Sequence, residues 1–323
     1  MKPRVLLTRR VPATVYRRLE EACEVDLHGE AAAIPGDELR RRVADKDALL
    51  CLLTDRVDRE VLEAAPRLKI VANIAVGYDN VDVASAAARG IVVTNTPEVL
   101  TEATAELTWA LILAATRRIA EGDRAVRAGR WGGWALDYML GMQLSGKQLG
   151  VIGLGRIGTA VASRAPAFGM SVAAASLPGQ PVSQSGGVPL PPIVTVPLDE
   201  LLRTSDVVTL HVPLTPDTRH LIDRPRLARM KRSAYLVNTS RGPVVDEEAL
   251  AWALGERLIA GAALDVYERE PLVHPALLPL DNVVLAPHLG SATTETRTAM
   301  ADLAVSNVLE VLAGRPPLTP VHP

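Results

Sequence analysis

The chain has 323 residues, of which 48% are hydrophobic and 22% charged, and its formal net charge is −2. This composition is typical of a globular protein of about two domains, and the balanced charge gives no argument for nucleic acid or a membrane surface as partner. Cys23 and Cys51 lack metal-site or redox-pair spacing, so we expect buried free thiols and no bound metal. The short apolar run near the N-terminus favours a strand over a signal peptide and, by default, a cytoplasmic location.

The first hundred residues alternate short apolar runs, typical of buried strands, with helical patterns. The predicted strands are residues 5–8, 24–27, 48–53, 69–74 and 91–94, and the predicted helices are residues 13–22, 37–46, 58–65 and 80–88. A β-α-β series of this kind predicts a parallel sheet.

A longer helix is predicted next, over residues 101–120, with Thr101 as its N-cap. A second β-α-β series follows, with predicted strands at residues 149–152, 171–175, 207–210, 235–238, 260–264 and 283–286. Residues 177–193 are rich in Pro, Gly and Ser and are predicted to form a surface loop. A last helix is predicted over residues 294–312.

These two series predict an α/β protein with two parallel-sheet domains. Because the last helix can return to the first series, we expect a split, flavodoxin-like substrate domain of residues 1–98 plus 291–323. A Rossmann-type dinucleotide-binding domain, residues 99–290, would be inserted into it. Active-site residues are then expected to collect in the cleft between the domains.

A glycine motif opens the second series. Gly153, Gly155 and Gly158 are spaced as G-x-G-x-x-G directly after an apolar strand and before a helix. The first glycine permits the tight turn, the second lets a pyrophosphate approach the backbone, and the third lets the helix pack on the strand. The helix N-terminus offers N–H groups and positive dipole charge to phosphates. A purely structural turn is the alternative reading.

The position that distinguishes NAD from NADP is less informative. A carboxylate about 20 residues past the glycines usually holds the ribose hydroxyls in NAD-specific sites. Here that position falls near Ser176, with no acidic residue and no arginine until Arg203. Either NADP(H) or NAD(H) is therefore permitted, and the missing carboxylate favours NADP(H) slightly.

Three polar side chains follow successive predicted strands at the edge where such sheets bind ligands: Arg241, Glu270 and His288. Reduction of a 2-oxo acid with a nicotinamide cofactor needs such a set. A guanidinium can hold the carboxylate and polarise the carbonyl, a histidine can donate the proton, and a carboxylate beside it favours its protonated form. Singly, the three could be a surface ion pair, a turn residue and a core histidine. Their joint placement favours a catalytic set.

These residues lie in motifs with a family resemblance. GLGRIG, HVPLTPDTRHLI, VNTSRGPVVDEEAL, GAALDVYEREP and PHLGSAT resemble, in order, the motifs of D-isomer-specific 2-hydroxyacid dehydrogenases. LLCLLTDRVD, ANIAVGYDNVD, NTPEVLTEATAELTWALIL and GRWGGW are most similar to those of the glyoxylate/hydroxypyruvate reductases. The chain departs from the family pattern near Ser176, where neither the usual Asp nor the arginines of NADP-preferring relatives occur.

The resemblance implies further roles. The Val76 and Gly77 backbone amides would hold the substrate carboxylate, and Leu53 would line the substrate pocket. Asp265 would hydrogen-bond the nicotinamide carboxamide. The other residues expected to bind the cofactor are Thr104, Arg156, Ile157, Ser176, His211, Pro213, Thr218, Thr239 and Gly290.

Two tryptophans, Trp131 and Trp134, allow two readings: packing in a core or interface, or a role in catalysis across a homodimer. In the second reading, which the resemblance implies, Trp134 reaches the partner's active site and limits substrate size.

The expected function is the NAD(P)H-dependent reduction of a small 2-oxo acid such as glyoxylate or hydroxypyruvate. One alternative is another D-2-hydroxyacid dehydrogenase, acting on lactate, phosphoglycerate or a sugar acid. The chain ending at Pro323 disfavours the longest phosphoglycerate enzymes. The other alternative is a nicotinamide-sensing, corepressor-like binding protein.

Overall fold

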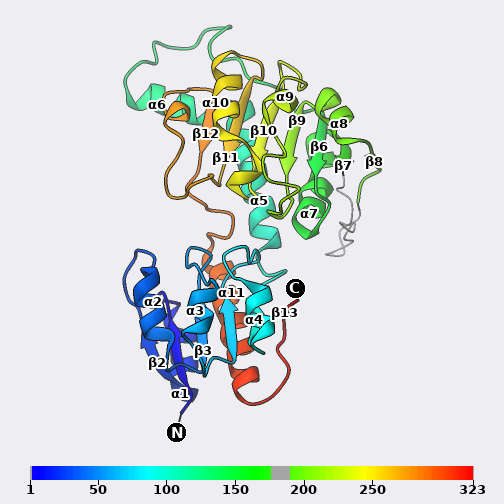
Figure 1. Cartoon of the computed structure of the whole chain (residues 1–323). Coiled ribbons are helices and arrows are strands. Elements are labelled where there is room, and N and C mark those ends of the chain that lie inside the picture. The colour runs from blue at the N-terminus through cyan, green and yellow to red at the C-terminus, as the bar shows by residue number, and fades with distance from the viewer. Residues whose placement is uncertain (1, 176–189, 323) are drawn as a thin grey trace. The chain divides into compact units, whose positions relative to one another are not determined.

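The computed structural model describes residues 2–175 and 190–322. The chain divides into two compact units, the first made of Met1–Leu100 with Thr293–Pro323 and the second of Thr101–Ala292. Each unit is built around its own β-sheet (Figure 1).

The first unit contains a six-stranded sheet in the order β2-β1-β3-β4-β5-β13. Its strands are β1 (Arg4–Leu7), β2 (Glu24–Leu27), β3 (Ala48–Cys51), β4 (Ile70–Asn73), β5 (Val92–Thr94) and β13 (Pro320–Val321). The first five run parallel in the flavodoxin-like order, and β13 is antiparallel to β5. The central strands β3 and β4 are buried at every residue, as expected for a sheet covered on both faces.

Helices cover this sheet. They are α1 (Ala13–Ala22), α2 (Gly36–Val43), α3 (Arg59–Glu63), α4 (Val83–Ala88) and α11 (Thr294–Leu312). Helix α11 packs on β3, β4 and α1, while apolar residues of α2, α3 and α4 share one core cluster with the sheet. Asp58 and Asp82 cap α3 and α4 by accepting hydrogen bonds from backbone N–H groups of the first turn.

The second unit contains a seven-stranded sheet in the order β8-β7-β6-β9-β10-β11-β12. Its strands are β6 (Gln148–Ile152), β7 (Ser171–Ala175), β8 (Ile193–Thr195), β9 (Val207–Leu210), β10 (Tyr235–Asn238), β11 (Gly261–Leu264) and β12 (Val283–Leu285). All neighbours pair in parallel. This is the Rossmann strand order with one added strand. The sequence order of the strands reverses between β6 and β9, because β7 and β8 follow β6 toward one edge of the sheet and β10 to β12 follow β9 toward the other. The predicted fold class is confirmed.

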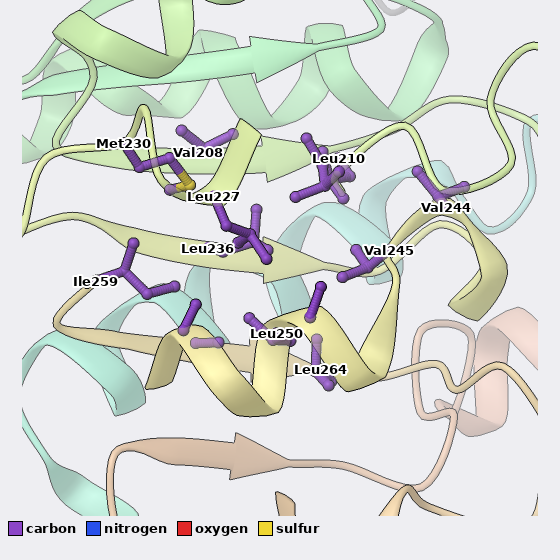
Figure 2. Packing of buried hydrophobic residues seen from close by; sticks show 14 of the residues in the cluster. Val208, Leu210, Leu227, Met230, Leu236, Val244, Val245, Leu250, Ile259 and Leu264 are labelled. Atoms are coloured by element: carbon purple, nitrogen blue, oxygen red, sulfur yellow. The ribbon is translucent and has the colours of Figure 1, made fainter. Parts of the chain in front are cut away.

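Helices on both faces complete the second unit: α5 (Thr101–Thr116), α6 (Ile119–Arg127), α7 (Arg156–Arg164), α8 (Leu198–Thr204), α9 (Arg224–Leu227) and α10 (Glu247–Gly255), with short turns η1 (Ala165–Phe168), η2 (Gly242–Val244) and η3 (Pro275–Leu277). Helices α5 and α7 share a buried cluster with one face of the sheet. The other face packs against α8, α9 and α10, where Leu227 and Leu250 meet Leu236 and Leu264 of the strands (Figure 2).

Some element predictions are wrong in detail. The single helix predicted over residues 101–120 is two helices, because Arg118 adopts a left-handed conformation with φ 55°. Thr101 is the first residue of α5 and not the residue before it. The predicted loop over residues 177–193 reaches into β8, which begins at Ile193, and its residues up to 189 lie outside the described part of the chain. The two cysteines are buried free thiols, as expected.

Among the helices of the described residues, none combines the length and apolarity needed to cross a lipid bilayer.

Candidate active site

The carboxyl edge of the second sheet carries the three predicted catalytic side chains. Arg241 follows β10, Glu270 follows β11, and His288 follows β12. Because these strands are parallel neighbours, their carboxyl ends meet at one edge.

His288 and Glu270 form a pair, with Nδ1 of His288 2.8 Å from Oε2 of Glu270. Each side chain is 27% exposed, so neither is a core residue nor freely solvated. Burial alone would raise the pKa of Glu270, but the hydrogen bond and charge of His288, the N–H of Tyr267 and the charge of Arg241 together lower it. Glu270 is therefore an ionised acceptor at neutral pH, and His288 must donate its Nδ1–H to it. The histidine is thus in the tautomer that leaves Nε2 for another partner.

Arg241 is placed by the turn that follows β10. The side chain of Asn238 holds this turn, since its Nδ2 donates to the Arg241 carbonyl at 2.9 Å and its Oδ1 accepts from the Ser240 N–H and hydroxyl. A Cβ on Gly242 would lie 1.8 Å from the Tyr267 carbonyl carbon, so the turn packs directly on the segment that leads to Glu270. Asn238 is a positioning residue that the sequence analysis missed, although it stands in the VNTSRG motif.

Asp265 has a role that the sequence did not predict. Its buried carboxylate accepts hydrogen bonds from the N–H groups of Leu289 at 2.6 Å and Gly290 at 2.8 Å, and its carbonyl accepts from the N–H of His288 at 2.9 Å. Burial raises the pKa of Asp265, against the lowering effect of these amides and of His288. These bonds hold His288 in a left-handed conformation with φ 54°, which is uncommon for a residue with a side chain. Asp265 therefore fixes the position of the histidine.

The glycine turn between β6 and α7 has the properties that the motif predicts. Gly153 has φ 94°, and a Cβ there would lie 2.8 Å from the His211 carbonyl oxygen. A Cβ on Gly158 would lie 2.0 Å from the Gly153 oxygen, so α7 packs closely on the turn. By contrast, a Cβ on Gly155 would meet no atom of the described residues within 4 Å. Gly155 is the N-cap of α7 without a side-chain cap, so within the described part of the chain nothing beside Gly155 blocks an approach to the first turn, which includes Arg156 and Ile157.

The other predicted cofactor residues fall into two groups in the second unit. Thr104, Thr239 and Gly290 are linked, since the Thr104 hydroxyl donates to the Gly290 carbonyl at 3.1 Å and Thr108 bridges Thr104 to the Thr239 hydroxyl. The second group lies after β9. There the Thr218 hydroxyl donates to the Pro213 carbonyl at 2.6 Å and closes the loop, with a Thr218 side chain that is almost fully buried.

His211, at the end of β9, is not a proton-transfer candidate. Burial lowers the pKa of its imidazole to about 3, so the ring is neutral, and its Nε2 lies 2.9 Å from the Thr209 hydroxyl. Ser176 lies outside the described residues.

The predicted substrate residues of the first unit lie at the carboxyl edge of its own sheet. Leu53 follows β3, and Val76 and Gly77 follow β4. The Val76 carbonyl accepts from Asn95 at 2.7 Å and the Gly77 carbonyl from Asn73 at 2.8 Å. Within the described part of the chain, the N–H groups of Val76 and Gly77 make no hydrogen bond to a protein acceptor. Two adjacent unused N–H groups suit a carboxylate.

Trp134 is 84% exposed and Trp131 56% exposed, so neither packs in the core of this chain. They belong to a segment after α6 that also exposes Leu136 and Leu140. Exposed apolar side chains gathered in one segment are typical of surfaces that contact another protein.

A Rossmann sheet with a glycine turn at its switch point and a histidine–carboxylate pair at its carboxyl edge defines the class of dinucleotide-dependent dehydrogenases. The family model for the NAD-binding domain of D-isomer specific 2-hydroxyacid dehydrogenases matches residues 109–290. The chain belongs to this family.

Similar proteins cover almost the whole chain. A glyoxylate reductase of Thermofilum pendens is 49% identical over 320 residues, which are 98% of this chain and 93% of the relative. A crystal structure of a protein from Thermus thermophilus has a TM-score of 0.91 at 47% identity and covers 98% of this chain and 99% of that one. An NADPH-dependent glyoxylate/hydroxypyruvate reductase from Sinorhizobium meliloti was solved with NADP and malonate. It has a TM-score of 0.84 at 38% identity, and the match covers 99% of this chain and 97% of that one.

Proposed function

We propose that this dehydrogenase reduces glyoxylate and hydroxypyruvate to the corresponding 2-hydroxy acids with a reduced nicotinamide dinucleotide. The observation that carries the proposal is the 2.8 Å hydrogen bond between His288 and Glu270, which follow neighbouring strands. The names of the Thermofilum and Sinorhizobium relatives support the choice of substrate.

The second unit fits a dinucleotide. The open approach at Gly155 and the first-turn N–H groups of α7 can take a pyrophosphate. We assign Thr104, Thr239, Gly290 and the loop closed by Thr218 to the remainder of the cofactor. When bound, the reduced nicotinamide supplies the hydride for the carbonyl carbon.

His288 supplies the proton. Its Nδ1–H is committed to the ionised Glu270, so a proton on Nε2 is the one available to the substrate oxygen. Glu270 keeps the ring oriented and stabilises the charge of the imidazolium. Once Nε2 has given its proton, the ring is neutral and Glu270 still accepts from Nδ1.

Arg241 binds and polarises the substrate. Its guanidinium can hold a carboxylate in two parallel hydrogen bonds while its charge draws electron density to the carbonyl oxygen. The Val76 and Gly77 N–H groups would bind the substrate carboxylate, and Leu53 would limit the space beside it.

For the cofactor, we propose a slight preference for NADPH over NADH. The sequence has Ser176 where NAD-specific sites carry an acidic residue, so no carboxylate repels a 2′-phosphate. The NADPH dependence of the Sinorhizobium relative supports this preference. A catalytic efficiency with NADH more than tenfold above that with NADPH would overturn it.

For the assembly, we propose a homodimer in which the exposed segment around Trp134 meets the second copy. Trp134→Ala should then raise the relative rate with bulky 2-oxo acids over glyoxylate, because a size limit is removed. Steady-state rates on both substrate classes check this, with light scattering for the mass of the assembly. A monomer, or an unchanged ratio of rates, would contradict the proposal. A cytoplasmic location stays a prediction.

The experiment that tests the function is a substrate panel. Purified protein is assayed with glyoxylate, hydroxypyruvate, pyruvate and a sugar-derived 2-oxo acid, each with NADH and NADPH, by the absorbance of the reduced nicotinamide. The proposal predicts the highest catalytic efficiency with glyoxylate or hydroxypyruvate. Preference for another 2-oxo acid would indicate a different member of the family, and absence of turnover on the whole panel would favour a nicotinamide-sensing binding protein.

A further inference from the structure

Two loops at the carboxyl edge of the first sheet are held by asparagine side chains that the proposed function has not used. The first loop, residues 52–58, carries Leu53, and the second, residues 74–82, carries Val76 and Gly77. The asparagines are Asn73 and Asn80 around the second loop and Asn95 after β5.

Asn95 determines where the Gly77 N–H points. Its Nδ2 donates to the Val76 carbonyl at 2.7 Å. That carbonyl and the Gly77 N–H belong to one planar, trans peptide group and point in opposite directions. Fixing the carbonyl therefore fixes the N–H.

The neighbouring peptide group is fixed in the same way. The Ala75 carbonyl accepts from the N–H of Thr96 at 2.8 Å, which directs the Val76 N–H to the opposite side. Asn95 and Thr96 are adjacent in sequence, so one short segment after β5 orients both N–H groups.

Asn80 connects the two loops. Its Nδ2 lies 3.1 Å from the Leu52 carbonyl and 3.0 Å from the Asp55 carbonyl, and its own carbonyl accepts from the Val57 N–H at 2.9 Å. Its Oδ1 accepts from Asn73 at 3.2 Å, and Asn73 also donates to the Gly77 carbonyl.

The first loop is also fixed from within. The buried carboxylate of Asp55 accepts from the Leu52 N–H at 2.8 Å and the Thr8 hydroxyl at 2.5 Å, with the Arg9 guanidinium 3.5 Å away. The residues on both sides of Leu53 are therefore held, and Asn80 sets this loop relative to Gly77.

We infer that Asn95 and Asn80 are positioning residues for the substrate. Asn95 aims the Val76 and Gly77 amides at the carboxylate of a 2-oxo acid, and Asn80 sets the distance between those amides and Leu53. A donor pair that is already held in place binds an anion without a loss of loop entropy. If the loops were free to move, this entropy would be lost on binding and the affinity would fall. The inference rests on the proposed function, because it takes the substrate from there.

The test uses Asn95→Ala, the isosteric Asn95→Asp and Asn80→Ala. Asn95→Ala should raise the KM for glyoxylate about tenfold or more, since hydrogen bonds to a charged group are lost or misdirected, while the KM for the cofactor stays unchanged. Asn95→Asp should do no better, because a carboxylate cannot donate to the Val76 carbonyl. Asn80→Ala should change the ratio of catalytic efficiencies for glyoxylate and hydroxypyruvate, since the space beside Leu53 changes.

The matched control is Asn282→Ala in the second unit. Asn282 also donates from Nδ2 to two backbone carbonyls, those of Leu254 and Ala260, both at 3.3 Å, and it lies before β12 at the amino edge of its sheet. This control should leave the KM for glyoxylate and the substrate ratio at wild-type values, even if its thermal unfolding midpoint falls.

The outcomes separate the two proposals. An active wild type whose KM for glyoxylate is unchanged in Asn95→Ala, or restored in Asn95→Asp, overturns the positioning role and leaves the proposed function intact. A wild type that turns over neither glyoxylate nor hydroxypyruvate overturns both.

Discussion

The carboxyl edges of the two sheets differ in the kind of group they present. The edge of the second unit carries side chains that hold or can take up charge: Arg241, Glu270, His288 and the buried Asp265. The corresponding edge of the first unit presents the neutral N–H groups of Val76 and Gly77, oriented by asparagine side chains.

This difference indicates which chemical roles of the proposed reaction each unit would supply. Proton transfer and polarisation need groups that gain, lose or carry charge, and those are side chains of the second unit. A carboxylate can also be bound by fixed dipoles, and in the proposed reaction the first unit supplies these from its backbone in addition to Arg241. Substitutions of His288 should therefore act mainly on turnover, those that disturb the Val76 and Gly77 amides mainly on the KM for the 2-oxo acid, and those of Arg241 on both.

The largest effect expected from a loss of substrate binding in the charged edge is that of Arg241→Ala. Loss of the guanidinium should lower kcat/KM for glyoxylate about 10²- to 10³-fold, because both carboxylate binding and carbonyl polarisation are lost. Arg241→Lys should recover only part of this, since an ammonium group cannot make two parallel hydrogen bonds. Steady-state kinetics on both variants check the prediction, and a lysine variant at wild-type efficiency would contradict the bidentate role.

Two glycines of one turn should separate cofactor binding from folding. Gly155→Ala should weaken NAD(P)H binding about tenfold or more, because its Cβ would point into the open approach, while the unfolding midpoint stays near that of wild type. Gly158→Ala should instead destabilise the fold by about 1–3 kcal/mol, since its Cβ would lie 2.0 Å from the Gly153 oxygen. Fluorescence titration and denaturant unfolding measure the two effects. Equal effects of both variants on unfolding would refute this assignment.

The smallest effect concerns stability and pH in the charged edge. Burial would raise the pKa of Glu270, but His288, the Tyr267 N–H and Arg241 lower it, so the folded pKa lies below the unfolded value. Such a carboxyl stabilises the fold above about pH 4.3, and this contribution is lost as the pH falls through the folded pKa. Glu270→Gln should therefore be less stable than wild type at neutral pH, with a difference that shrinks below about pH 4.

Urea unfolding over a pH series measures this difference, with the exposed Glu248→Gln on α10 as the control for removing one carboxylate. The free energy of unfolding of Glu270→Gln could instead stay below that of wild type by the same amount from about pH 7 to below about pH 4. This result would show that the carboxylate charge is not stabilised by its neighbours.

The sequence predicted the charged edge better than the neutral one. Arg241, Glu270 and His288 could be found because each follows one of three successive apolar strands, and parallel strands bring such residues to one edge. The clamp of Asp265 on Leu289 and Gly290 could not be found, because it joins a side chain to backbone groups 24 and 25 residues away. Asn80 and Asn95 were missed for the same reason, since asparagines in loops are common turn residues.

The fold shows the same limit. The strand series predicted both parallel sheets, because buried strands form continuous apolar runs. Strand β13 has only two residues, and its partner β5 is distant in sequence. Two residues are too few to form a periodic pattern, so the sequence did not predict this strand. The break between α5 and α6 depends on one residue in the left-handed conformation, Arg118. No glycine or proline stands there to indicate the end of a helix.

The central claim is that His288, held by Glu270, donates the proton to a small 2-oxo acid. The most direct test is the turnover number of His288→Ala with saturating glyoxylate and reduced cofactor, alongside its dissociation constant for that cofactor. The account predicts a fall in kcat of about 10²- to 10⁴-fold with cofactor affinity unchanged. A variant that turns over glyoxylate at the wild-type rate would contradict it.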